Sequence, residues 1–225
     1  MKTKSLFITG TDTNVGKTWA TLALMHSLQN QGLSVNALKP VAAGCVDQTG
    51  QLVNADALLM QRFATKSFTY PEINPYAFSQ ATSPHHACKG VCLDSELILK
   101  SYENISLQSD FVLVEGAGGW FSPVDTQWLN VDLAHLLNLP VLLVVGVRLG
   151  CINHALLTAQ AIKQSGLECA AWLAVVLDPG MDAIQSNLDY LRERLEMPCM
   201  GVLPNLSDAD FGFLAELICL DMLKI

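Results

Sequence analysis

Residues 10–18 read Gly-Thr-Asp-Thr-Asn-Val-Gly-Lys-Thr and follow the apolar run Leu6–Thr9. A strand that leads into a glycine loop and then a helix aims backbone N–H groups and a helix N-terminus at an anion such as a polyphosphate. The common motif has a glycine five residues before the Gly-Lys pair, but here Thr11 stands there and the glycine comes earlier, at Gly10. The segment predicts a variant phosphate-binding loop in an α/β fold, with a chance glycine turn as the alternative.

The order of apolar runs supports that fold class. The predicted strands are Leu6–Thr9, Ser34–Leu38, Phe111–Val114, Val141–Val145, Ala170–Val176 and Met200–Leu203. Several are apolar without alternation, as expected of parallel strands covered on both faces. Helical stripes lie between them, one at Thr21, Leu24, Met25 and Leu28 before Gly32, another at Ile184, Leu188, Leu191 and Leu195 before Pro198. Strand and helix alternate, which predicts a three-layer α/β/α sandwich with a mainly parallel sheet.

Composition fits one such domain over residues 1–225, because 51% of the residues are hydrophobic and only 15% are charged. The stretch from about 62 to 95 breaks the rhythm with three prolines, and we expect a long loop or irregular excursion packed on the same domain. A net charge of −8 without a Lys/Arg cluster argues against nucleic-acid binding. Seven cysteines at irregular spacing resemble reduced cytosolic thiols. With neither a leader nor a membrane-length apolar run, we expect a soluble cytoplasmic protein.

Candidate catalytic side chains follow several predicted strands, where ligands of open parallel sheets bind. Lys17 would reach the outer phosphates and the Thr18 hydroxyl would bind Mg²⁺. Lys39 would be a second cation that stabilises charge during phosphoryl transfer, or merely a solvated lysine. Glu115 at the end of a buried strand would bind Mg²⁺ or form a structural ion pair. Asp56, near a helix start, is not distinguished by spacing from an ordinary first-turn acid.

Two other groups of residues favour structural interpretations. His85, His86, Cys88 and Cys92 suggest zinc, but their spacing matches no familiar ligand set, which favours a surface loop. Trp120, Phe121 and Trp128 are typical of packing or of a pocket wall.

Several segments together resemble the dethiobiotin synthetases. The matching segments are Gly10-Thr11-Asp12-Thr13 with Gly16-Lys17-Thr18, Lys39-Pro40-Val41, Asn74-Pro75-Tyr76, Thr82-Ser83-Pro84-His85, Val114 to Trp120, and Leu149 to His154. The displaced loop glycine and the Glu-Gly-Ala-Gly-Gly segment are the specific parts of the match. The resemblance implies a P-loop NTPase-like fold and a cyclo-ligase of biotin biosynthesis that uses ATP, Mg²⁺, CO₂ or bicarbonate and diaminopelargonate, in a homodimer.

The resemblance also implies roles for particular residues. Lys17 and Lys39 would be catalytic, and Thr18, Asp56 and Glu115 would hold Mg²⁺. The nucleotide would contact Thr13, Asn14, Val15, Gly16, Lys17, Thr18, Trp19, Asp56, Glu115, Gly116, Ala117, Gly118, Val175, Pro204, Asn205 and Leu206. The substrate would contact Thr13 and Ala43, together with Gly150, Cys151, Ile152 and Asn153 at a helix N-terminus, apparently from the partner subunit.

Three positions depart from the family pattern. Asn14 stands where the loop often has an acidic residue, and Ala43 where a serine can touch the substrate. Val175 occupies the strand end where an asparagine commonly reads adenine, and valine cannot form those hydrogen bonds. Asp178 or the backbone at 204–206 would then read the base. A non-catalytic nucleotide-binding module of the same fold is the alternative function.

Overall fold

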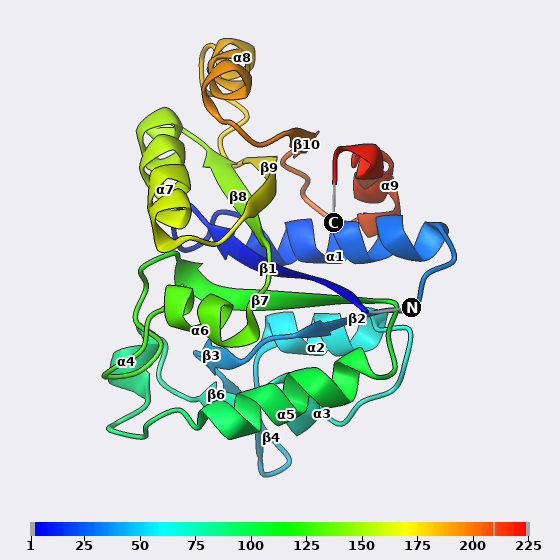
Figure 1. Ribbon diagram of the computed structural model, residues 1–225, viewed down its shortest axis with the longest axis vertical. Helices are drawn as coiled ribbons and strands as arrows, with labels where there is room; N and C mark the ends of the chain where they lie inside the picture. The colour runs from blue at the N-terminus through cyan, green and yellow to red at the C-terminus, as the bar shows by residue number, and fades with distance from the viewer. Residues whose placement is uncertain (1–2, 209, 224–225) are drawn as a thin grey trace.

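The computed structural model describes residues 3–208 and 210–223. Within this part of the chain the main sheet has six strands, and all neighbouring strands run parallel. The strands are β1 (Lys4–Gly10), β2 (Val35–Leu38), β7 (Phe111–Gly119), β8 (Val141–Val147), β9 (Cys169–Val176) and β10 (Cys199–Leu203). They lie side by side in the order β10-β9-β8-β1-β7-β2 (Figure 1). Each predicted apolar run forms one of them.

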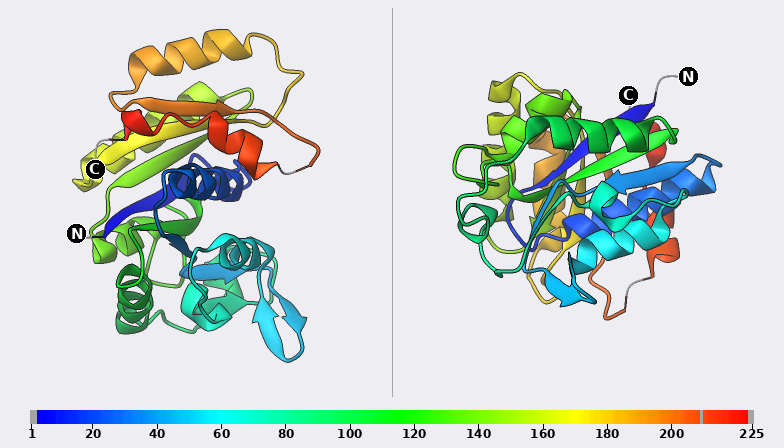
Figure 2. Two further views of the ribbon diagram at one scale, coloured as in Figure 1. Left: turned by 90° about the vertical axis from the view of Figure 1, so that its right-hand side faces the viewer. Right: turned by 90° about the horizontal axis from the view of Figure 1, so that it is seen from below.

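Helices cover both faces of this sheet. They are α1 (Lys17–Asn30), α2 (Ala55–Phe63), α3 (Tyr70–Ile73), α4 (Pro84–Ala87), α5 (Ser95–Ser106), α6 (Asn130–Leu137), α7 (Cys151–Ser165), α8 (Ile184–Arg194), α9 (Phe211–Glu216) and the 3₁₀ helix η1 (Leu220–Met222). Helices α1 and α9 pack on one face, and α5 to α8 pack on the other (Figures 1 and 2). Across the described residues, none of the helices has both the length and the apolar character needed to cross a membrane.

The side chains of β1 show why the predicted strands lack alternation. Leu6 and Ile8 point into the core shared with α1 and α9, whereas Phe7 between them points into the core on the opposite face. All three are fully buried. Because both faces of the sheet are covered, these three successive positions are all apolar. This arrangement confirms the predicted three-layer α/β/α sandwich.

The helix after the phosphate loop forms as its apolar stripe predicts. Helix α1 begins at Lys17, directly after Gly16, whose φ of 85° lies in the left-handed region that favours glycine. The helix ends at Asn30, and Gly32 closes its last turn by donating its N–H to the carbonyl of Gln29 at 2.8 Å. The loop and the helix are therefore joined without an intervening linker, so the helix N-terminus opens directly onto the loop.

Residues 62–95 contain short elements between irregular segments. Strand β6 (Tyr76–Phe78) pairs in parallel with β3 (Val41–Ala43), just after β2. Helices α3 and α4 each carry a proline in the first turn, where its missing N–H has no helical partner to lose. The hairpin of β4 (Val46–Gln48) and β5 (Gln51–Val53) projects from the body nearby (Figure 2). The β3–β6 pairing brings residues 62–95 against the segment that follows β2.

Candidate active site

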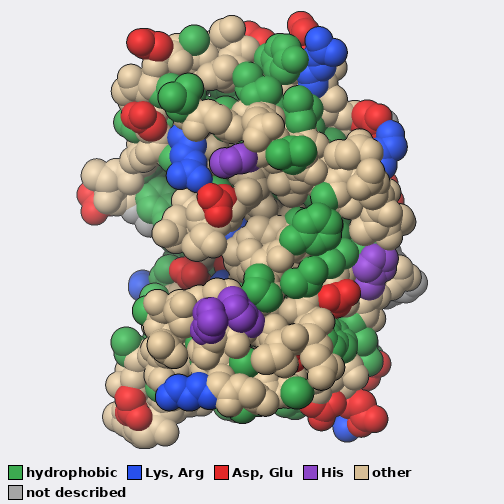
Figure 3. Space-filling view, turned by 90° about the vertical axis from the view of Figure 1, so that its left-hand side faces the viewer, with side chains coloured by type: hydrophobic (Ala, Val, Ile, Leu, Met, Phe, Trp, Pro, Cys, Tyr) green, Lys and Arg blue, Asp and Glu red, His purple; other side chains and the backbone are tan. Residues whose placement is uncertain are grey.

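A cavity of about 950 Å³ opens at the carboxyl ends of the central strands. Its walls come from the phosphate loop, the start of α1, the ends of β2, β7 and β9, the start of α2, and residues 81–84 and 204–206. The carboxyl ends point toward the viewer in Figure 3, where the surface is hollowed at its left edge. Lys and Arg side chains are dispersed over this face. The cavity lies where open parallel sheets bind their ligands.

Most residues predicted for the nucleotide and the substrate line this cavity. They are Thr13, Asn14, Gly16, Lys17, Thr18, Trp19, Lys39, Ala43, Asp56, Glu115, Gly116, Ala117, Gly118, Val175, Pro204, Asn205 and Leu206. Val15 is buried beneath the loop, and residues 150–153 begin α7 outside the cavity of this single chain. The sequence therefore identified most of the cavity wall.

The displaced glycine of the phosphate loop has a steric cause. A Cβ at Gly10 would lie 2.5 Å from the Val15 Cγ2 atom, so only glycine lets the buried Val15 side chain fold back over the strand end. A Cβ at Gly16 would lie 2.6 Å from Cγ1 of Val175. The Val175 side chain therefore lies directly against the backbone of Gly16, beneath the loop. Asn14 adopts a left-handed φ of 56°, which asparagine tolerates better than most residues.

Asp12 organises the outer part of the loop. Its Oδ1 accepts a hydrogen bond from the Thr13 N–H at 2.7 Å, and its Oδ2 forms an ion pair with Nη2 of Arg148 at 2.8 Å. The Asp12 carbonyl accepts a hydrogen bond from Lys17 Nζ at 3.2 Å. Lys17 is buried, and burial lowers its pKa to about 8, although Glu115 opposes this shift.

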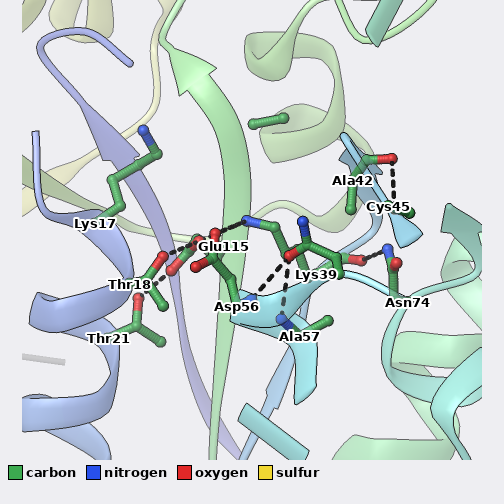
Figure 4. A network of polar contacts seen from close by, with 12 residues as sticks. Lys17, Thr18, Thr21, Lys39, Ala42, Cys45, Asp56, Ala57, Asn74 and Glu115 are labelled. Atoms are coloured by element: carbon green, nitrogen blue, oxygen red, sulfur yellow. Dashed lines mark hydrogen bonds and ion pairs between the residues drawn. The ribbon is translucent and has the colours of Figure 1, made fainter. Parts of the chain in front are cut away.

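A buried ion pair lies at the centre of the cavity wall (Figure 4). Lys39 Nζ lies 2.6 Å from Glu115 Oε1 and 3.7 Å from Asp56 Oδ2. Glu115 is 1% exposed and Lys39 is 6% exposed, so neither charge is solvated by bulk water. Burial lowers the pKa of Lys39, but the carboxylates of Glu115 and Asp56 outweigh it and leave that pKa above its ordinary value. Lys39 is therefore a fixed cation, and the interpretation as a solvated surface lysine is wrong.

Helix α1 holds both oxygens of Glu115. The Thr18 hydroxyl donates to Oε1 at 3.1 Å, and the Thr21 hydroxyl, one turn later, donates to Oε2 at 2.7 Å. Thr21 was predicted only as part of the apolar stripe, because a threonine one turn into a helix carries no sequence signal of such a contact. Strand β7 also continues past Glu115 to Gly119, so this carboxylate lies within the strand and not at its end.

Asn130 and Ser122 hold the glycine segment after Glu115. The fully buried Asn130 amide donates to the carbonyls of Ala117 and Gly119 at 2.6 and 2.7 Å, and its Oδ1 accepts from the Ala117 N–H at 3.1 Å. Ser122 Oγ accepts from the Gly119 N–H at 2.8 Å. A Cβ at Gly118 would lie 2.5 Å from this Oγ, which requires glycine there. Neither Asn130 nor Ser122 was predicted, because both act from outside the motif.

The oxygen donors of Thr18, Asp56 and Glu115 fit a magnesium ion. Mg²⁺ prefers oxygen ligands and is commonly bound by one or two carboxylates together with substrate phosphates. The described residues contain no cluster of three or more His, Cys, Asp or Glu side chains placed to bind a metal ion by themselves. The arrangement therefore suits a cation that arrives with a phosphate ligand.

We expect Thr21→Val to lower the free energy of unfolding by about 1–3 kcal/mol, because the Glu115 carboxylate, which is buried from bulk water, loses a hydrogen-bond donor. Thr21→Ser keeps the hydroxyl and is the matched control. Urea denaturation monitored by circular dichroism measures both. A Thr21→Val protein as stable as Thr21→Ser would contradict the importance of this hydrogen bond.

The comparisons with solved structures concern the fold alone. The MinD cell division protein of Aquifex aeolicus aligns with a TM-score of 0.56 at 15% identity, over 96% of this chain and 88% of that chain. The signal recognition particle receptor FtsY of Elizabethkingia anophelis, in complex with GDP, aligns with a TM-score of 0.50 at 17% identity, over 94% of this chain and 59% of that chain. Together with the parallel sheet, these confirm the P-loop NTPase-like fold.

Sequence comparison is more specific. Residues 4–211 match a family model described as an AAA domain. The ATP-dependent dethiobiotin synthetase BioD of Pseudomonas aeruginosa is 47% identical over 208 residues, 91% of each chain. The protein of the same name from Xanthomonas oryzae pv. oryzae is 42% identical over 218 residues, 96% of this chain and 97% of that one. The chain therefore belongs to the dethiobiotin synthetase family.

Proposed function

We propose that this protein is a dethiobiotin synthetase, a cyclo-ligase that uses Mg-ATP to join 7,8-diaminopelargonate and CO₂ into the ureido ring of dethiobiotin. The observation that carries the proposal is the buried Lys39–Glu115 pair beside a phosphate loop, in a chain that matches relatives of that name over almost its whole length. Such a site positions anionic groups and neutralises their charge, which is most of what phosphoryl transfer requires.

The reaction would proceed in three balanced steps. One substrate amine adds to CO₂ and loses a proton, which gives a carbamate. A carbamate oxygen then attacks the γ-phosphorus of ATP and displaces ADP, which gives a carbamic-phosphoric anhydride. The second amine attacks the carbamate carbon, loses a proton and expels phosphate, which closes the ring.

Both buried lysines would neutralise negative charge on the phosphates and the carbamate. Lys17, at the start of α1, would contact the outer phosphates when its Nζ leaves the Asp12 carbonyl. Lys39 would contact the carbamate and the transferred phosphoryl group. Its raised pKa keeps this side chain charged, and the buried Glu115 carboxylate orients it. A fixed cation in a site screened from water stabilises developing negative charge more effectively than one in bulk water.

Thr18, Asp56 and Glu115 would hold the magnesium ion. When bound, Mg²⁺ supplies charge neutralisation at the β- and γ-phosphate oxygens. The side chain of Asp56 is 43% exposed at the start of α2, so its carboxylate is open to a ligand in the cavity. The Asn54 side chain accepts hydrogen bonds from the Asp56 and Ala57 N–H groups, which orients this helix start.

The substrate would lie between Thr13 and Ala43 on one subunit and residues 150–153 on its homodimer partner. In a single chain residues 150–153 lie outside the cavity, whereas the start of the 15-residue helix α7 can receive a carboxylate. Leu149, next to this helix start, is 90% exposed. We propose neither a membrane nor a nucleic acid as a partner of this site. We also propose that the enzyme is cytoplasmic.

The decisive assay incubates the protein with diaminopelargonate, bicarbonate, Mg²⁺ and ATP, and measures dethiobiotin by mass spectrometry together with released phosphate. We expect one phosphate per dethiobiotin, and no product when any component is omitted. A folded protein that binds ATP but makes no dethiobiotin with any nucleoside triphosphate would instead support the non-catalytic module.

The same assay with CTP and GTP tests how the base is read. Val175 packs against Gly16 and carries no hydrogen-bonding group, so it cannot distinguish the bases. Asn205 lines the cavity, and its Nδ2 donates to the Leu177 carbonyl at 3.0 Å, which leaves its Oδ1 as a possible acceptor. Strict use of ATP would show that adenine is read by a group other than Val175, with Asp178 and the backbone at 204–206 as the candidates.

We expect Lys39→Ala to abolish dethiobiotin formation, since the reacting anions lose their fixed cation. The change also leaves the buried Glu115 carboxylate without its cation, so the free energy of unfolding should fall by about 3–5 kcal/mol. Near-ultraviolet circular dichroism at low temperature establishes that the variant is folded. Lys100→Ala, which removes an exposed lysine of α5, is the control. Near-normal turnover by Lys39→Ala would remove Lys39 from the catalytic set.

Nucleotide binding should take up a proton in alkaline solution. The pKa of Lys17 is lowered to about 8 in the free protein, so at pH 9 most Lys17 amines are neutral. Contact with negative phosphates would raise this pKa, and each neutral amine would then bind a proton. Calorimetric titration with a non-hydrolysable ATP analogue, in buffers of different ionisation enthalpy, should show greater uptake at pH 9 than at pH 7. Equal uptake at both values would place Lys17 away from the phosphates.

A further inference from the structure

Residues 62–95 contribute a buried chain of hydrogen bonds that joins Lys39 to the start of α2. Asn74, which is 2% exposed, donates from Nδ2 to the Lys39 carbonyl at 2.7 Å and to the Tyr76 carbonyl at 3.2 Å. Figure 4 shows Asn74 beside the Lys39 backbone. The Lys39 N–H donates to the carbonyl of Ile73 at 2.8 Å. Both polar groups of the Lys39 backbone are therefore bound by the last residue of α3 and the residue after it.

The chain of hydrogen bonds continues through the hydroxyl of Tyr70. This hydroxyl donates to Asn74 Oδ1 at 2.7 Å and accepts from the Asn54 N–H at 2.7 Å. Asn54 is the N-cap of α2, and its side chain binds the Asp56 N–H. The Tyr70 hydroxyl thus links Asn74, which binds the Lys39 backbone, to Asn54. Asn54 is the N-cap of the helix that carries Asp56.

The hydrogen bonds of this chain have a single polarity. The Asn74 amide nitrogen faces two carbonyls, so its oxygen must face Tyr70, and the Tyr70 hydroxyl must then donate toward Asn74 and accept from Asn54. Burial raises the pKa of Tyr70 to about 12, so the hydroxyl keeps its proton. An ordered, fully paired network of this kind holds its members in one arrangement.

We propose that Tyr70 and Asn74 are positioning residues for the reaction, and that they set the placement of Lys39 relative to Asp56. The inference rests on the proposed function, in which Lys39 stabilises the reacting anions and Asp56 helps to hold the magnesium ion. Lys39 follows β2 and Asp56 lies in the first turn of α2. Lys39 Nζ and Asp56 Oδ2 are 3.7 Å apart, and Asp56 is partly exposed. Such a contact is too weak to fix the spacing of the two groups. The buried network supplies the missing constraint.

The test is a double-mutant cycle on Tyr70→Phe and Asn74→Ala. Tyr70→Phe removes only the hydroxyl, and we expect kcat per competent site to fall about tenfold, because small displacements of catalytic groups are costly. We expect kcat to fall by a larger factor than the KM for ATP rises, because the hydrogen bonds of this network reach Lys39 and the start of α2 but not the phosphate loop. The double variant should be little slower than Asn74→Ala alone, because both changes break the same hydrogen-bonded network.

The hydrogen bond between Tyr102 and Ser5 provides a matched control. It is 2.9 Å long and joins α5 to the amino end of β1, whereas the cavity lies at the carboxyl ends of the strands. Tyr102→Phe removes the same hydroxyl chemistry, and we expect its kcat and KM to equal those of the unmodified protein. Competent sites are counted from the binding stoichiometry of an ATP analogue, so a loss of folded protein does not count as a loss of kcat.

The outcomes separate the inference from the proposed function. The positioning role is wrong if the unmodified protein makes dethiobiotin and Tyr70→Phe has the same kcat. It is also wrong if Tyr70→Phe and Tyr102→Phe lower kcat equally. If the unmodified protein makes no dethiobiotin, the proposed function fails. The crystal structure of Tyr70→Phe then decides the inference, because we expect the Lys39 Nζ to Asp56 Oδ2 separation to depart from 3.7 Å. An unchanged separation would overturn it, and so would an unfolded Tyr70→Phe accompanied by a folded, fully active Asn74→Ala.

Discussion

The Lys39–Glu115 ion pair is the interaction on which the site depends. Each charge is buried, and a buried charge without a partner is strongly destabilising, so the elements that carry them must be placed accurately. Glu115 comes from β7 and Lys39 follows β2, the edge strand beside it. Helix α1 adds two threonine hydroxyls to the same carboxylate. The ion pair and its hydrogen bonds thus tie the central sheet to the helix that carries the phosphate loop.

The two lysines of the cavity differ because their carboxylate neighbours differ. Lys39 contacts Glu115 directly, and its pKa is raised. Lys17 donates to a backbone carbonyl, and burial lowers its pKa to about 8. As the pH rises, Lys17 therefore loses its charge before Lys39 does.

Most of the fold was predictable because its signals are local. Parallel strands covered on both faces are continuous apolar runs, and all six were identified, as were the helices after Gly16 and before Pro198. Cavity residues inside the motifs were also predicted. Thr21, Asn130 and Tyr70 were not, because each acts through side-chain hydrogen bonds that only the folded chain brings together. Neither residue type nor spacing reveals such a contact.

The sequence by itself determined the fold class, the phosphate loop and the likeness to the dethiobiotin synthetases, since each rests on residue order within short segments. Only the tertiary structure decided that Glu115 binds Lys39 and both threonines, that Val175 supports the loop from below, and that residues 62–95 hold the Lys39 backbone. The physical reason is burial. A charge or amide excluded from water must find its partner among groups that the fold brings near, and those groups lie far apart along the chain.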